Sequence, residues 1–386
     1  TRLEFQRFDD PKENALGPRG FRPFFCAHRA LAWPRLAIMK HFLKAGRDLS
    51  ADDPRPRMSS LPEPYATLSR RLGTDLLERR LLIQASHWAH LDHQGAGIFK
   101  LERFFPIDPL VRLGLRLTGL YSRGHRNHLS PRLVERSWHL PRLPAAFEGF
   151  RLLQLTDLHL DLDPGFLDAL LSILAPLSYD ALVITGDYRN STRDDFTPCL
   201  TLARRLLASL PDVPRYGILG NHDFIEQVPD LENAGLPLLL NESAAIERDG
   251  GRLWFAGVDD PHFYRTHDLA AATAGIPSDA CTILLAHSPE IADQLARDRF
   301  DLVLCGHTHG GQLCLPGGRW LHVPVKHQPP ARIRGPWLAP DGLTQGYTSP
   351  GTGSCSVPVR LNCPGEITLH HLRAANRDCS GGRGFE

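Results

Sequence analysis

The chain has 386 residues, of which 42% are hydrophobic and 23% charged, as is typical of a globular protein with a sizeable core. No run of about 18 apolar residues occurs, which excludes an ordinary membrane-spanning helix, and no signal peptide is visible at the start. The net charge of +1 conceals an asymmetry, because residues 1–144 carry 25 Lys and Arg against 14 Asp and Glu, whereas the remainder carries 19 against 29. The eight cysteines form no C-x-x-C pair, so we expect reduced thiols in a cytoplasmic protein.

The basic region 1–144 is predicted to be mainly helical, because residues 65–83 and 110–121 place apolar and charged positions at helical spacing. Three interpretations stay open for this region. It is a helical extension packed on the rest of the chain, an element that binds an anionic membrane surface, or, with least support, a nucleic-acid-binding region that lacks a known motif. The membrane interpretation depends on apolar and basic residues that share one segment: Phe104, Phe105, Leu110, Val111, Leu113, Leu115, Leu117 and Leu120, with Arg112, Arg116, Arg123 and Arg126.

From about Phe150, short apolar segments alternate with helical patterns, which is typical of an α/β domain. We expect helices at 166–177 and 196–210. Strands are expected at 151–156, 181–185, 216–219, 236–240, 252–258, 281–285, 301–305, 312–315 and 366–372. The close spacing of the later strands predicts a second sheet. We therefore assign residues 145–373 to this domain and predict that 374–386 form a disordered tail.

Five short polar clusters each follow a predicted apolar strand. They are Asp157-Leu-His159, Gly186-Asp187, Gly220-Asn-His-Asp223, Ala286-His287 and Gly306-His-Thr-His309. Because ligands in open α/β sheets bind at the carboxyl ends of strands, all five clusters can converge on one crevice. Their oxygen and imidazole donors suit a pair of Mn, Fe or Zn ions better than a structural zinc site built from cysteines. The glycines before Asp187, Asn221 and His307 let the backbone turn sharply as it leaves each strand.

Taken together, these clusters resemble the signature of the calcineurin-like metallophosphoesterases over about residues 146–373. Gly310-Gly-Gln312, Gly257-Val-Asp-Asp-Pro261 and Pro358-Val-Arg360 are similar to the bacterial branch that contains UDP-2,3-diacylglucosamine pyrophosphatases and related phosphodiesterases. One departure is Arg189-Asn190, where relatives often place a small or acidic residue. The resemblance implies an α/β (α+β) fold, a four-layer sandwich of two mixed β-sheets flanked by helices, with the N-terminal region as a mainly helical extension.

The resemblance also implies how the ligands divide between two divalent metal ions. One ion takes Asp157, His159, Asp187 and His309, and the other takes Asp187, Asn221, His287 and His307, so that Asp187 bridges them. Two ions about 3.5–4 Å apart can share a hydroxide that attacks phosphorus. We assign His222 as the group that protonates the leaving group or stabilises the charged phosphoryl group, with Asp223 orienting its ring. Arg189 is either a contact to the substrate phosphate or an exposed surface residue.

The predicted function is hydrolysis of a phosphodiester or diphosphate, extending to a lipid-linked diphosphate if the basic region binds the inner face of a membrane. Two alternatives stay open. One is a phosphomonoesterase such as a protein phosphatase, and the other is a non-catalytic scaffold that kept the fold. A scaffold would have lost several ligands or His222, and all are present. The segment Gly351-Thr-Gly-Ser354 lacks the lysine of a phosphate-binding loop and is predicted to be a turn.

Overall fold

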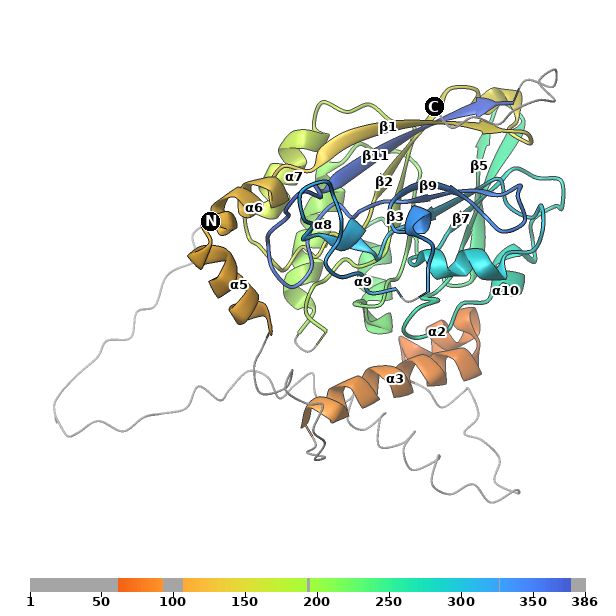
Figure 1. Cartoon of the computed structure of the whole chain (residues 1–386). Coiled ribbons are helices and arrows are strands. Elements are labelled where there is room, and N and C mark those ends of the chain that lie inside the picture. Colours follow the sequence, from red (N-terminus) through yellow and green to blue (C-terminus); the bar gives the residue numbers. More distant parts are fainter. Residues whose placement is uncertain (1–61, 93–106, 193–194, 326, 376–386) are drawn as a thin grey trace, which may run out of the picture. The chain divides into compact units, whose positions relative to one another are not determined.

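Two β-sheets form the centre of the fold (Figure 1). The computed structural model describes residues 62–92, 107–192, 195–325 and 327–375. The first sheet has the order β1-β11-β2-β3-β4, in which β11 runs antiparallel to β2 and the other neighbours are parallel. Its strands are β1 (Arg132–Leu140), β2 (Phe150–Leu155), β3 (Ala181–Thr185), β4 (Arg215–Ile218) and β11 (Glu366–Ala374). Strand β3 is buried at every residue, as expected for an apolar strand covered on both faces.

The second sheet has the order β5-β6-β7-β8-β10-β9. Strands β6, β7, β8 and β10 are parallel, and the two edge strands β5 and β9 are antiparallel to their neighbours. The strands are β5 (Glu242–Arg248), β6 (Gly251–Gly257), β7 (Thr282–Leu285), β8 (Leu302–Cys305), β9 (Gly335–Leu338) and β10 (Gln345–Thr348). The parallel strands β2, β3, β4 of the first sheet and β7, β8 of the second bring the polar clusters to their carboxyl ends.

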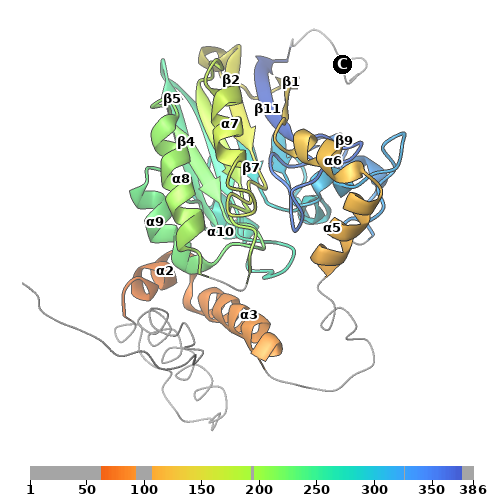
Figure 2. The ribbon, with the colours of Figure 1, turned by 90° about the vertical axis from the view of Figure 1, so that its left-hand side faces the viewer.

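Apolar side chains join the sheets and helices into four layers (Figure 2). One cluster lies between the sheets and contains Leu152 and Val183 from the first sheet with Phe255 and Leu285 from the second. The outer face of the first sheet is covered by α7 (Phe166–Leu174), α8 (Thr197–Ser209) and α9 (Val228–Asn233). The outer face of the second sheet is covered by α10 (Leu269–Thr273) and a 3₁₀ helix at Pro289–Gln294. The predicted sandwich of two mixed sheets flanked by helices is confirmed.

Four helices precede the first strand in the described part of the chain, and three of them lie mainly within the segments that were expected to be helical, 65–83 and 110–121. They are α2 (Tyr65–Leu72), α3 (Thr74–Asp92), α5 (Ile107–Leu117) and α6 (Leu120–His128). Gly73 and Gly119 separate the helices of each pair with φ angles of 88° and 71°, a left-handed backbone that glycine adopts without strain. Within the described residues, no helix combines the length and apolar character needed to cross a bilayer.

The structure differs from the expected elements at several places. The region expected to be mainly helical contains strand β1, an edge strand in which Arg132 and Glu135 are exposed and whose partner, β11, lies more than 200 residues later. Segments 236–240 and 312–315 form isolated bridges instead of strands, and β5, β9 and β10 were not predicted. Strand β11 continues to Ala374, and the remaining tail from 376, like Phe104 and Phe105, lies outside the described residues.

Candidate metal centre

The predicted ligands leave their strands through unusual backbone conformations. Asp157 and His159 follow β2, Asp187 follows β3, Asn221 follows β4, His287 follows β7, and His307 and His309 follow β8. Five of them have φ angles between 43° and 71°: Asp157, His159, Asp187, His307 and His309. A left-handed non-glycine residue costs about 1–2 kcal/mol, and such residues concentrate at functional sites. The turn lets both members of the i, i+2 pairs face the same site.

The glycines that precede the ligands have two different roles. Gly186 turns the backbone sharply with a φ of 91°, as predicted. Gly220 and Gly306 are needed for space instead, because a Cβ atom at Gly220 would overlap with the carboxylate of Asp187, and one at Gly306 would overlap with the carboxylate of Asp157. The glycines therefore allow strands of the two sheets to approach the carboxylates closely.

Asp187 lies at the centre of the site. Its Oδ2 is 3.3 Å from Nε2 of His287 and 3.7 Å from Nε2 of His159, while its Oδ1 accepts the backbone N–H of His222 at 2.8 Å. Two groups of potential ligand atoms, each within 4.8 Å of one another, contain this carboxylate. One group is Asp157, His159 and Asp187, and the other is Asp187, His287 and His307.

His309 and Asn221 complete the two groups. Nε2 of His309 is 3.2 Å from Nε2 of His159 and 3.5 Å from Oδ1 of Asp157. On the other side, Oδ1 of Asn221 is 3.0 Å from Nε2 of His287. All seven predicted ligands therefore converge on one cluster around Asp187.

Main-chain carbonyls orient the imidazole rings toward the cluster. Nδ1 of His159 donates to the carbonyl of Arg189, and Nδ1 of His287 donates to the carbonyl of Thr185, both at 2.8 Å. Each contact turns Nε2 of the ring toward Asp187, as the supporting contacts of metal-ligating histidines do. Nε2 of His307 is buried and has no hydrogen-bond partner among the described residues. A buried imidazole nitrogen without a partner, next to a carboxylate, fits a metal ligand.

The electrostatics of the cluster also favour a cation. Burial alone would raise the pKa of Asp187, but His287, His222 and His159 outweigh burial and hold this pKa well below its usual value. Burial would likewise lower the pKa of His287, yet the charge of Asp187 raises it to about 10. Since metal binding displaces protons from its ligands, a divalent cation at this carboxylate can replace the proton of His287.

His222 lies beside the cluster of ligands. Its Nδ1 donates to the carbonyl of Asn190 at 2.7 Å, and its ring packs edge-on against His159 with centroids 4.8 Å apart. Burial would lower the pKa of His222, but the charge of Asp187 raises it well above the usual value. The role of His222 as the acid stays a prediction.

Asp223 does not orient the ring of His222, contrary to the prediction. Its carboxylate accepts the backbone N–H groups of Asp187, Tyr188 and Gly220 at 2.7, 3.0 and 2.9 Å. It therefore ties the loop after β3 to the loop after β4, while the carbonyl of Asn190 holds the His222 ring. The sequence did not indicate that Asn190, and not Asp223, holds the His222 ring, because this contact joins two loops that lie far apart in the chain.

The family model of the calcineurin-like phosphoesterases matches residues 150–311, the segment that supplies all seven ligands and His222. The chain contains a calcineurin-like metallophosphoesterase domain. It is 31% identical over 269 residues to the transmembrane protein with metallophosphoesterase domain of Danio rerio, covering 64% of this chain and 58% of that protein.

Two bacterial relatives match the metallophosphoesterase domain over more of their own length. The uncharacterized metallophosphoesterase YkuE of Bacillus subtilis is 27% identical over 267 residues, which cover 66% of this chain and 90% of YkuE. The phosphodiesterase YaeI of Escherichia coli is 27% identical over 235 residues, which cover 58% of this chain and 82% of YaeI. The chain spans little more than half the length of the Danio rerio relative.

Arg189 has a different position in the metallophosphoesterase domain from the one predicted. Its side chain is buried, and its guanidinium lies 4.3 Å from the centroid of the Phe224 ring. A substrate phosphate could reach this guanidinium only if the side chain moved. The structure therefore favours a role for the main chain of Arg189, whose carbonyl holds His159, over the predicted phosphate contact.

Several residues that support the metallophosphoesterase site were not assigned to it from the sequence, although Arg360 belongs to the Pro358-Val-Arg360 motif. Arg360 is buried, and its Nη2 lies 3.3 Å from Nδ1 of His309 and donates to the carbonyl of Pro350 at 2.8 Å. The predicted turn at 351–354 packs on the site, because Gly353 N–H donates to the carbonyl of Asp157 at 3.0 Å. In the sequence, Gly351 and Gly353 are the residues that could have indicated this close packing. The segment continues to Cys355, whose Sγ is 3.8 Å from Nε2 of His222.

Proposed function

We propose that this chain is a metal-dependent hydrolase of phosphodiesters or diphosphates that uses two divalent ions, Mn, Fe or Zn. The observation that carries the proposal is Asp187, because one ionised carboxylate belongs to both groups of potential ligands. A shared carboxylate is the feature that two neighbouring ions need. The phosphodiesterase name of YaeI supports the diester class of substrate.

The ligands divide around Asp187. Asp157, His159 and His309 lie on one side of it, and Asn221, His287 and His307 lie on the other. A pair of ions held there supplies Lewis acidity toward the phosphate oxygens and a water-derived nucleophile at neutral pH. The carbonyls behind His159 and His287 keep each ring in the orientation that this requires.

His222 supplies the proton in this proposal. It lies next to the shared carboxylate, and its Nδ1 is fixed by Asn190. Its Nε2 faces the segment that contains Cys355, at the edge of the cluster. A leaving alkoxide or phosphate placed there can receive the proton, which is worth about 10²–10⁴-fold in rate for general acid catalysis.

Hydrolysis of bis(p-nitrophenyl) phosphate by the purified full chain with Mn²⁺ tests this function. We expect activity that EDTA abolishes and added Mn²⁺ restores. Asp187→Asn should reduce the rate to background, and His222→Ala should reduce it about 10²–10⁴-fold. Matched controls are Asp249→Asn and His139→Ala, which change an exposed aspartate and an exposed histidine far from the ligands in the fold.

Two outcomes would reject the proposal. Full activity in EDTA would exclude metal dependence, and full activity of Asp187→Asn would exclude the shared ligand. Faster hydrolysis of p-nitrophenyl phosphate than of the diester would favour a phosphomonoesterase, and metal binding without turnover of either ester would favour a scaffold. The membership of the UDP-2,3-diacylglucosamine branch and the cytoplasmic location remain predictions.

A further inference from the structure

Helix α5 presents an apolar stripe to solvent. Leu110, Leu113 and Leu117 are 64%, 52% and 79% exposed, and their i, i+3, i+7 spacing places them on one face of the helix. Leu120, at the start of α6, is 38% exposed and extends the stripe. Among the described residues, none of these four leucines belongs to an apolar cluster. An exposed apolar patch of this kind marks an interaction surface.

The other face of α5 is anchored on the domain. Val111 and Leu115 pack against the apolar cluster formed by Val357, Val359 and Leu361. The helix is therefore held in one orientation, and the exposed leucines are the face that this packing turns outward. A helix with two apolar faces, of which one is already buried, needs a partner for the second.

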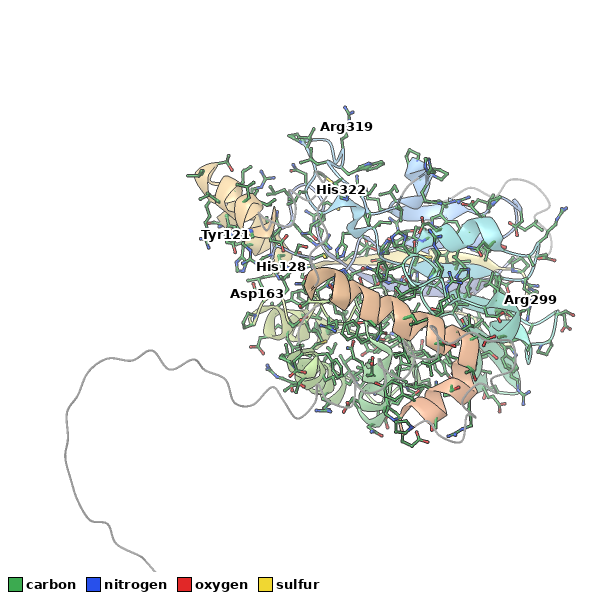
Figure 3. All side chains as sticks on the ribbon, turned by 90° about the horizontal axis from the view of Figure 1, so that it is seen from below. Tyr121, His128, Asp163, Arg299, Arg319 and His322 are labelled. Atoms are coloured by element: carbon green, nitrogen blue, oxygen red, sulfur yellow. The ribbon has the colours of Figure 1, made fainter. Side chains whose placement is uncertain are left out.

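Helix α6 strengthens this anchor (Figure 3). Nε2 of His125 lies 2.6 Å from Oδ2 of Asp163, and Nδ1 of the buried His128 lies 2.9 Å from Oγ of Ser354. The main-chain carbonyl of Gly124 accepts the N–H of Arg360 at 2.9 Å. The α5–α6 pair is thus fixed to the segment that supports His309.

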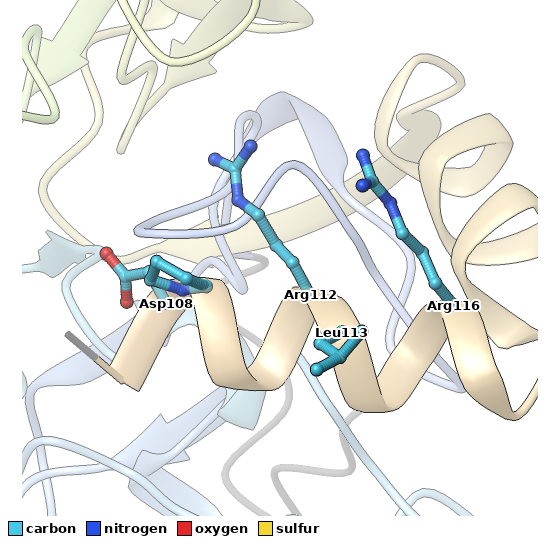
Figure 4. A pocket seen from close by; sticks show the side chains of 5 residues that line it. Asp108, Arg112, Leu113 and Arg116 are labelled. Carbon is cyan, nitrogen blue, oxygen red and sulfur yellow. The ribbon is translucent and has the colours of Figure 1, made fainter. Parts of the chain in front are cut away.

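Positive charge lies beside the exposed leucines. Asp108, Arg112 and Arg116 project from one side of α5, and Leu113 projects from another (Figure 4). Helices α5 and α6 contain four arginines, Arg112, Arg116, Arg123 and Arg126, and in the described part of the chain none of them forms an ion pair. Arg112 and Arg123 donate instead to a neutral carbonyl and a neutral amide, those of Ser356 and Asn362.

An anionic bilayer suits a surface of leucines with neighbouring arginines better than a second copy of the chain does. Apolar side chains enter the boundary between headgroups and acyl chains, while arginines bind the anionic headgroups. Two copies that met through this face would bring their own arginines together, which is unfavourable. We propose that the exposed leucine face of α5 docks on an anionic lipid surface.

The docking face is close in the fold to the metal centre. Arg112 donates to the carbonyl of Ser356 at 3.3 Å, and Ser356 N–H donates to Oδ1 of Asn190 at 2.8 Å. The carbonyl of the same Asn190 holds the ring of His222. These contacts connect the docking helix to the residue that holds the His222 ring.

Flotation of the purified full chain with vesicles tests the docking without any turnover. Wild type should bind vesicles of phosphatidylcholine and phosphatidylglycerol and bind phosphatidylcholine alone much more weakly. The combined variant Leu110→Gln, Leu113→Gln, Leu117→Gln should bind about 100-fold more weakly or less. Leu133→Gln with Leu338→Gln, two exposed leucines on strands β1 and β9, is the matched control and should bind as wild type does.

A second variant separates charge from apolar contact. Arg116→Gln with Arg123→Gln should weaken binding to the anionic vesicles about fivefold per arginine, and added salt should diminish the difference. Equal binding by wild type and the leucine variant would overturn the proposal. So would equal binding to neutral and anionic vesicles, or a dimer in solution that the leucine variant converts to monomer.

Discussion

The helix pairs α2–α3 and α5–α6 both precede the metallophosphoesterase domain, and they are attached to it by different kinds of contact. Helices α2 and α3 insert charged side chains into the domain and bury Leu68, Leu72 and Leu77 in its main core. Helix α5 packs on a small apolar cluster and leaves three of its leucines exposed. Helices α2 and α3 therefore support the metal centre, whereas α5 offers an exposed apolar surface.

Arg80 of α3 shows how the first pair supports the site. Its side chain is buried, with Nη1 2.5 Å from Oδ1 of Asp259, and it lies 3.9 Å from the ring centroid of Tyr264. Its Nη2 donates to the carbonyl of Asp223 at 2.9 Å. Because Asp223 binds the backbone of Asp187, the helix is connected to the shared carboxylate through two contacts.

The largest expected effect on stability follows from removing this buried charge. Arg80→Met leaves the buried carboxylate of Asp259 without its ion-pair partner, and we expect the free energy of unfolding to fall by about 3–5 kcal/mol. Urea denaturation measures the change. Arg79→Met, at the exposed neighbouring position, is the control and should stay within about 0.5 kcal/mol of wild type. Similar losses in both variants would contradict the supporting role of α3.

Two leucines test the contrast between the helix pairs directly. Leu77 of α3 is 2% exposed and Leu117 of α5 is 79% exposed. We expect Leu77→Ala to lower the free energy of unfolding by about 2–5 kcal/mol, because it leaves a cavity in the core. Leu117→Ala should change it by less than about 0.5 kcal/mol. A large loss from Leu117→Ala would show that this leucine is covered and would break the comparison.

Two glycines sharpen the difference between α5 and α6. A Cβ atom at Gly124 in α6 would overlap with Val359, whereas Gly114 in α5 has open space around it. Gly124→Ala should therefore destabilise the fold by about 1–3 kcal/mol through overpacking. Gly114→Ala should stabilise it by up to about 1 kcal/mol, since alanine favours the helix. Thermal unfolding of the two variants gives the signs, and equal signs would contradict the packing described for α6.

A pH-dependent stability difference should report on the α6 anchor. Burial lowers the pKa of His128 to about 3, well under its unfolded value, so the unfolded chain binds more protons between pH 3 and 6.5. The stability that neutral His128 contributes is thus present above pH 6.5 and is lost as the pH falls. We expect a loss of about 1–2 kcal/mol at pH 5. The slope of stability against pH should be smaller in His128→Gln, and an unchanged slope would contradict the burial of a neutral ring.

The sequence predicted most of the site because its signals are local. Each polar cluster follows directly on an apolar strand, so Asp157, Asp187 and His307 could be placed at strand ends from short segments alone. The glycines next to them mark positions where only glycine fits. Much of α2, α3 and α5 was found by helical spacing for the same reason, whereas α6 lies almost wholly beyond the segment predicted at 110–121.

What the sequence did not predict depends on contacts between distant segments. The ring of His222 is held by Asn190, and Arg80 reaches Asp259 from nearly 180 positions earlier in the chain. Strand β1 pairs with β11, which no local pattern in a charged edge strand reveals. The basic amphipathic character of α5 was visible, but which leucines are exposed was determined by packing on Val357 and Val359.

Counting the metal ions bound to the purified full chain tests the central claim most directly. The protein is loaded with Mn²⁺, freed of excess metal by gel filtration, and analysed by inductively coupled plasma mass spectrometry. Two ions per chain are expected for wild type, because Asp187 belongs to both ligand groups, and Asp187→Asn should retain fewer. Asp249→Asn serves as the control and should retain two. At most one ion in wild type, or two in Asp187→Asn, would contradict a dinuclear centre bridged by Asp187.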